Sequence, residues 1–190
     1  MNEQFVTNAI EKDRYLKAMR LVDRFETDVM RELENTCKRI IENNPKLFPE
    51  DYSLSTNKFE NSNSLRTLRV EVPLNRKEST DQDADRVKFY TAIEWTEPED
   101  RLEETPSESS LCVAHYKMRP NPRADYDLIK SKTKQDERWQ IRCGDDVHDS
   151  DRGVFYIPIT DGEEMKHALA ELREHFSTYG HHFGVDSDEN

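Results

Sequence analysis

The stretch MRLVDRFETDVMRELENTCKRIIEN, residues 19–43, decides the fold of this chain. Its apolar residues recur at steps of three or four, which places them on one side of an α-helix. They are Met19, Val22, Phe25, Val29, Leu33, Cys37 and Ile40. No glycine or proline occurs between Glu3 and Asn43, and the Asn44-Pro45 pair ends the pattern because a residue before proline avoids the helical region. The sequence therefore predicts one long N-terminal helix.

The length of this helix limits how it can pack. An unbroken helix from Glu3 to Asn43 would extend roughly 60 Å, which exceeds the width of a domain of this size. Either the helix breaks within residues 8–15, or part of it overhangs the domain and meets a partner. The face opposite the stripe alternates acids and bases, as Asp23, Arg24 and Glu26 do, and we expect it to be solvated.

Downstream of a turn-rich segment, residues 45–64, the apolar period changes from that of a helix to that of a strand. Leu68, Val70, Val72 and Leu74 alternate with polar residues, and Pro73 indicates an edge position or a strand end. The same alternation recurs further along the chain and predicts four more strands, at 87–95, 111–119, 139–143 and 154–159. Polar loops connect them, among them the acidic segment 96–110. The sequence therefore predicts an antiparallel sheet.

A second helix is predicted at the C-terminal end. Asp161 and Glu164 form a capping-box pattern. The apolar residues that follow share one helical face: Met165, Leu169, Leu172, Phe176 and Tyr179. Gly180 stands where a left-handed C-cap is expected.

Together these elements predict an α+β fold with a long N-terminal helix, an antiparallel sheet of four or five strands, and a C-terminal helix packed on one sheet face. The chain of 190 residues is long enough for one hydrophobic core. We expect a single domain at 1–180 and an acidic tail at 181–190.

The composition excludes some classes of partner. The net charge of -12 repels nucleic acid and anionic membranes, so that binding to either would need a local basic patch. The hydrophobic content is 34% and the charged content 36%, which fits either an acidic cytosolic protein or one adapted to concentrated salt. Cys37, Cys112 and Cys143 lack paired spacing, and no stretch has the roughly 20 apolar residues that span a bilayer. We expect a cytoplasmic protein that does not enter the membrane.

The glycines exclude two large enzyme classes. All five glycines lie from Gly144 onward, so that no glycine-rich phosphate loop follows any of the first three strands. A P-loop enzyme or a dinucleotide-binding fold is therefore not expected. The GxSxG and HExxH motifs of common hydrolases are also absent.

Two groups of residues have the chemistry of metal ligands. The first crowds oxygen ligands and an imidazole into one loop, which suits a divalent cation: Asp145, Asp146, His148, Asp149 and Asp151. The spacing does not fit an EF-hand, and a solvated acidic turn is the alternative. The second is His167, Glu171 and His175, four residues apart on the C-terminal helix, which could hold zinc with His181 or His182. Exposed helical histidines without a ligand are the alternative there. No other cofactor is expected.

One segment runs against the acidic charge of the chain. Between residues 117 and 134 bases outnumber acids and interleave with aromatic residues. Such a segment can hold a phosphate backbone, stack a base, or dock an acidic protein surface. The candidate binding residues are Tyr116, Lys117, Arg119, Arg123, Tyr126, Lys130, Lys132 and Lys134. Nucleic acid could bind only here, and a charged loop balanced by neighbouring acids is the alternative.

The order of helix, three strands, possible short helix and strand, together with the stretch LCVAHYK (111–117), resembles the core of the PD-(D/E)XK nuclease superfamily. The resemblance implies that Lys117 is the motif lysine and that Glu99 or Asp100 supplies an upstream metal ligand. His115 stands where the motif has an acid, which departs from the family pattern. This stretch is also consistent with an exposed polar strand.

We therefore expect a non-catalytic binding or regulatory protein that acts through protein-protein contacts, as a dimer or as a subunit of a complex. Its surfaces would be the overhanging part of the N-terminal helix and the outer sheet face. The alternative is a metal-dependent, nuclease-like enzyme or a nucleic-acid-binding protein centred on the third strand and the basic segment. A third reading is an acidic decoy that occupies a nucleic-acid-binding protein.

Overall fold

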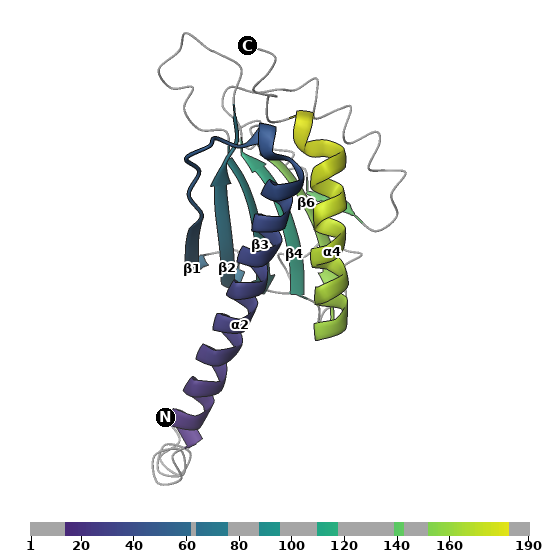
Figure 1. Cartoon of the computed structure of the whole chain (residues 1–190). Coiled ribbons are helices and arrows are strands. Elements are labelled where there is room, and N and C mark those ends of the chain that lie inside the picture. Colours follow the sequence, from purple (N-terminus) through teal and green to yellow (C-terminus); the bar gives the residue numbers. More distant parts are fainter. Residues whose placement is uncertain are drawn as a thin grey trace.

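The computed structural model describes residues 14–61, 64–75, 88–95, 110–117, 139–142 and 152–182. A long helix comes first, then the strands, then a second helix (Figure 1). The helical elements are α2 (Arg14–Asn43), η1 (Pro45–Leu47), α4 (Gly162–Tyr179) and η4 (Gly180–His182). The strands are β1 (Ser55–Asn61), β2 (Ser64–Pro73), β3 (Lys88–Trp95), β4 (Ser110–Lys117), β5 (Gln140–Arg142) and β6 (Arg152–Ile159).

The strands form one antiparallel sheet in the order β1-β2-β3-β4-β6-β5. The predicted α+β class is confirmed, and each of the five predicted strands has a counterpart in β2 to β6. The structure adds β1, which the sequence analysis assigned to a turn-rich segment. Its residues STNKFEN lack the alternating apolar pattern because β1 is an edge strand that pairs only with β2 among the described strands. Pro73 lies at the end of β2, where no further ladder hydrogen bond is needed.

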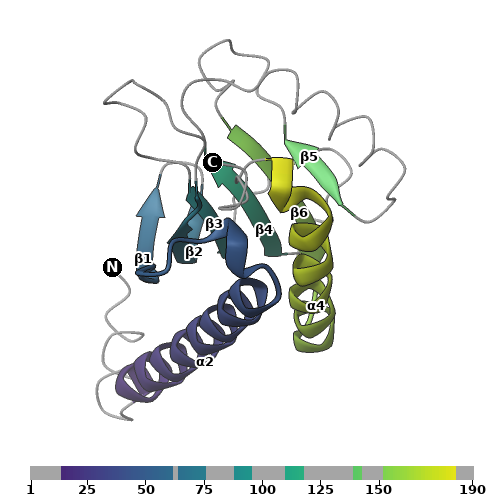
Figure 2. The same ribbon diagram turned by 45° about the horizontal axis from the view of Figure 1, so that its top comes forward.

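Both helices cover the same face of the sheet (Figure 2). The core lies between them and that face, and α4 contributes Phe176, whose ring stacks on Phe48 and meets Phe89 edge-on. Alternate residues of the strands point into this core, as Leu68, Val70 and Val72 of β2 do. Trp139 is buried in the core and Trp95 packs against it, so that both tryptophans anchor the core.

The opposite face of the sheet has a buried centre and a charged rim. Ala92 of β3, Val113 of β4 and Tyr156 of β6 form a second buried cluster there. Nearer the β1 edge, Glu71 forms ion pairs with Arg69 and Lys88, at 2.6 and 3.4 Å. Because the centre is already buried, the described residues of this face offer a partner charged side chains at the rim and little apolar surface.

The start of α4 matches the predicted cap. Asp161 accepts hydrogen bonds from the backbone N–H groups of Glu163 and Glu164, at 2.8 and 2.9 Å. The carboxylate of Glu164 reaches back to Thr160, accepting from its backbone N–H at 2.7 Å and from its hydroxyl at 2.6 Å.

The end of α4 differs from the left-handed C-cap that the sequence predicted. Gly180 is right-handed helical, with φ -58° and ψ -34°, and α4 continues into η4. A Cβ at this position would lie 2.7 to 2.9 Å from ring atoms of the buried Phe176. Glycine is therefore required here for space beside an aromatic ring, not for a left-handed backbone.

Candidate protein-binding surface

The N-terminal part of α2 projects beyond the end of the sheet (Figure 1). We call residues 14–25 the overhang. Along the rest of the helix the stripe is buried, as at Val29, Leu33 and Ile40. Within the overhang the same stripe continues through Tyr15, Met19 and Val22, but these residues are 61%, 52% and 56% exposed. The apolar pattern of the helix therefore extends past the surface that covers it.

Further apolar side chains widen this exposed stripe. Leu16 and Phe25 lie on its two sides and are about half exposed, while Leu21 lies outside it, one turn before Phe25. The exposed side chains together leave on the order of 500 Å² of apolar surface. This area is comparable with the largest patches of ordinary monomers, roughly 300–600 Å², which often mark binding sites. We call Tyr15, Leu16, Met19, Val22 and Phe25 the overhang stripe.

A buried ion cluster marks the point where α2 leaves the sheet. Glu26 was predicted on the solvated face opposite the stripe, but it occupies the stripe between Val22 and Val29, and its side chain is only 9% exposed. Arg66 of β2 donates from Nε to Oε1 at 2.8 Å and from Nη2 to Oε2 at 3.0 Å. Lys58 of β1 lies 3.2 Å from the same carboxylate. The hydrogen bonds from Arg66, and then those from Lys58, hold the pKa of Glu26 below its usual value although burial opposes this.

This cluster and an aromatic contact set the position of the helix along the sheet. The bidentate pair from Arg66 needs Glu26 at one height on β2. One residue earlier, Phe25 meets Trp95 of β3 edge-to-face, with ring centroids 5.8 Å apart. A shift of α2 by one turn would break both contacts, and so they hold the overhang outside the sheet.

The overhang also differs from the chain in charge. It contains four bases, Arg14, Lys17, Arg20 and Arg24, and one acid, Asp23, which gives a net charge of +3. All five side chains are exposed. A basic segment in a chain of net charge -12 creates a local field that attracts acidic groups.

The structure describes little of the predicted basic segment and loop site. Arg119, Arg123, Tyr126, Lys130, Lys132 and Lys134 lie outside the described residues, as does the loop with Asp145, Asp146, His148, Asp149 and Asp151. Glu99, Asp100 and Cys143 are outside them too. The backbone of Tyr116 and Lys117 lies at the end of β4, where Lys117 is in register with Lys88 of β3 and Arg152 of β6. These predictions therefore stay untested.

The structure corrects the second candidate metal site at one residue, His175. His175 is buried beside Trp139, Phe155 and Tyr179, with ring centroids 4.5 to 4.7 Å away, and so it belongs to the core. Burial lowers its pKa to about 3. His167 is exposed and lies 4.0 Å from Glu163. Within the described part of the chain, no three histidine, cysteine, aspartate or glutamate side chains gather as metal ligands.

The two described cysteines are also core residues. Cys37 and Cys112 are buried free thiols, and burial raises the pKa of each to about 12. A thiol with so high a pKa is not a nucleophile at neutral pH.

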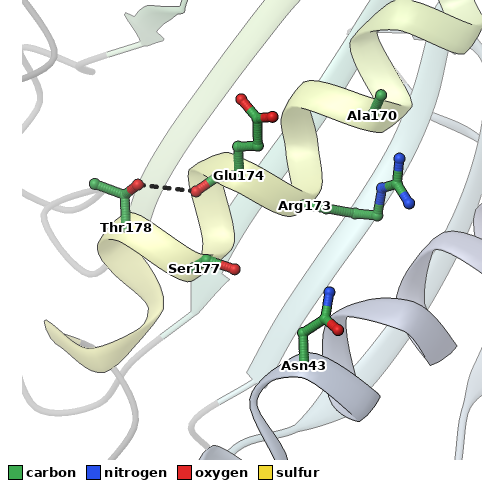
Figure 3. A pocket seen from close by; sticks show the side chains of 6 residues that line it. All are labelled: Asn43, Ala170, Arg173, Glu174, Ser177 and Thr178. Carbon is green, nitrogen blue, oxygen red and sulfur yellow. Dashed lines mark hydrogen bonds between the residues drawn. The ribbon is translucent and has the colours of Figure 1, made fainter.

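A shallow hollow of about 440 Å³ lies where the C-terminal end of α2 meets α4 (Figure 3). Its lining is mostly polar, and the hydroxyl of Thr178 donates to the backbone oxygen of Glu174 at 2.9 Å. Ligand pockets are usually lined by apolar groups with a few convergent polar ones. The hollow lacks such walls. Its lining residues are Asn43, Ala170, Arg173, Glu174, Ser177 and Thr178.

In comparison with known proteins, no protein-family model, no curated protein and no solved structure matches this chain. None of the described helices is both long and apolar enough to cross a lipid bilayer. An overhang was one of the two alternatives that the sequence offered for the N-terminal helix, but Tyr15 and Leu16 were not predicted as part of its surface, nor Glu26 as a buried ion at its base. The available signal for Glu26 was a charge within the apolar spacing.

Proposed function

We propose that this chain is a non-catalytic binding or regulatory protein that acts through protein-protein contacts, as a subunit of a complex. One observation carries the proposal: the apolar stripe of α2 continues past the sheet, so that Tyr15, Met19 and Val22 stay more than half exposed. Burying this stripe against a partner would stabilise the complex by about 25 cal/mol for each Å² of apolar surface removed from water. A binding role explains why these positions are apolar.

Two further features support this proposal. The overhang is one end of a continuous helix whose other end is packed in the core, and so its exposed side chains are held on a rigid element. The contacts at Phe25 and Glu26 prevent α2 from sliding to cover the stripe with its own sheet. The surface is therefore presented to a partner in a fixed orientation.

The test is affinity capture from the source lysate at native salt, with and without nuclease treatment, comparing the wild type with two variants of the overhang. Val22→Glu places a charge in the overhang stripe. Leu21→Glu makes the same change at the neighbouring residue, which is 70% exposed and lies outside the overhang stripe. Because both sites are exposed, neither change should alter stability by more than about 0.5 kcal/mol.

We expect a stoichiometric protein that the wild type and Leu21→Glu retain and that Val22→Glu loses. Purified separately, that protein should bind again with the same preference among the variants. Capture of one set of proteins by all three forms would contradict the proposal. So would recovery of nucleic acid alone, lost on Lys130→Glu or Lys132→Glu, which would favour the nucleic-acid alternative.

A further inference from the structure

The overhang stripe lies on the side of α2 that faces the sheet further along the helix. Tyr15 and Val22 lie on the same side of α2 as Val29 and Leu33, which contact the core. The space beneath the overhang is therefore a continuation of the layer that the sheet occupies further along the helix. The overhang extends for about 18 Å at 1.5 Å per residue, or a little over three helical turns.

We propose that this space binds one amphipathic helix whose apolar face is flanked by acidic residues, a proposal that rests on the protein-binding function above. A helix with its side chains is about 10–12 Å thick and packs 8–10 Å from its neighbour, which matches the thickness of a sheet layer. Helix-in-groove recognition of this kind uses apolar anchors at steps of three and four. Tyr15, Met19 and Val22 provide that spacing.

Shape disfavours a membrane as the occupant. The strands approach α2 from the side on which the overhang stripe is exposed, and they begin immediately beyond Phe25, at its contact with Trp95. A flat bilayer laid against the overhang would meet the end of the sheet before it reached Val22. A single helix can enter beside that edge.

Charge disfavours a second copy of the chain and selects an acidic partner. Two overhangs placed face to face would bring together two segments of net charge +3 at helix-packing distance. An acidic helix would instead place carboxylates near Arg14, which lies beside the stripe. Lys17, Arg20 and Arg24, behind the stripe, add a longer-range attraction that salt screens over about 10 Å.

The test uses two synthetic helical peptides of about 14 residues, long enough to span the overhang. Both have leucines at steps of three and four, and they differ only in flanking residues, glutamate in one and lysine in the other. Binding is measured by fluorescence anisotropy at low and high salt. Arg14→Glu with Arg20→Glu is compared with Lys38→Glu plus Arg39→Glu, an equal charge change at exposed sites on the sheet-backed part of α2.

We expect the glutamate peptide to bind at least about tenfold more tightly than the lysine peptide at low salt, with a smaller difference at high salt. Arg14→Glu with Arg20→Glu should reverse the preference, and Lys38→Glu with Arg39→Glu should preserve it. Met19→Glu should abolish binding of both peptides. Equal binding of the two peptides, or binding unaffected by Met19→Glu, would overturn the proposal.

Two other occupants would also overturn it. One is a dimer of the free protein that Met19→Glu dissociates, measured by light scattering. The other is binding to phosphatidylserine vesicles that is lost on the same change. If neither peptide binds while the captured protein is still lost on Val22→Glu, this inference fails and the proposed function stands. If neither peptide binds and nothing is captured, both fail.

Discussion

Replacing Glu26 with glutamine tests whether the ion cluster stabilises the junction between the overhang and the sheet. Glutamine has nearly the same shape, so the change removes charge with little effect on packing. Its amide oxygen can accept one of the two hydrogen bonds that Arg66 donates at 2.8 and 3.0 Å, but it has no charge to offer Lys58 at 3.2 Å. The folded state therefore loses one charge-assisted bond and two Coulomb interactions.

The magnitude follows from the exposure of the partners. A hydrogen bond to a charged group contributes about 1.5–3 kcal/mol when buried. The side chains of Arg66 and Lys58 are 34% and 36% exposed, so that water screens part of this interaction and solvates both cations after the change. We expect Glu26→Gln to lower the free energy of unfolding by about 1–2 kcal/mol at pH 7. Glu32→Gln, at an exposed site on the same helix, should change it by less than about 0.5 kcal/mol.

The pH dependence makes this prediction specific. The folded-state pKa of Glu26 is lowered from 4.5, so the carboxylate contributes stability above about pH 4.5 and loses that contribution as pH falls through the lowered pKa. Urea unfolding of wild type and Glu26→Gln, followed by circular dichroism from pH 7 to pH 3, should give curves that converge at the acidic end. Equal stabilities at pH 7, or a difference that persists unchanged at pH 3, would refute the reasoning.

Three further predictions concern the core. Gly180→Ala should lower the free energy of unfolding by about 1–3 kcal/mol, because its Cβ would clash with the ring of Phe176. Gly162→Ala, with open space around it, should be neutral or slightly stabilising. Urea midpoints that shift equally in the two variants would contradict this. In a Cys143→Ser background, Cys37 and Cys112, with pKa values of about 12, should not react with a thiol reagent at pH 8 until urea unfolds the chain. Fast labelling of the folded protein would argue against their burial. Burial lowers the pKa of His175 to about 3, so the unfolded chain binds one more proton than the folded chain below pH 6.5. The free energy of unfolding should therefore fall as pH falls toward 4, by up to about 1.4 kcal/mol per pH unit. His175→Phe should flatten that slope, and an unchanged slope would show that other groups cause it.

Periodicity made most of the fold predictable from the sequence. The run from Met19 to Ile40 and the alternation from Leu68 to Leu74 are local patterns, and each identifies its element without reference to any other. β1 was not predicted because an edge strand of polar residues has no buried face to impose a period of two. His175 was misplaced because the apolar face of α4 is wide enough to include it, between Leu172 and Tyr179, although imidazole is usually exposed.

The candidate surface was likewise only partly predictable from the sequence. The sequence by itself determined that one helix has an apolar stripe longer than a domain is wide, because spacing and length are properties of the chain alone. Only the tertiary structure decided where along that stripe burial stops. That boundary depends on Arg66, Lys58 and Trp95, which are far from Glu26 and Phe25 in sequence and meet them only when the sheet has formed. Which apolar residues stay in water is therefore decided by long-range contacts, and no local pattern encodes it.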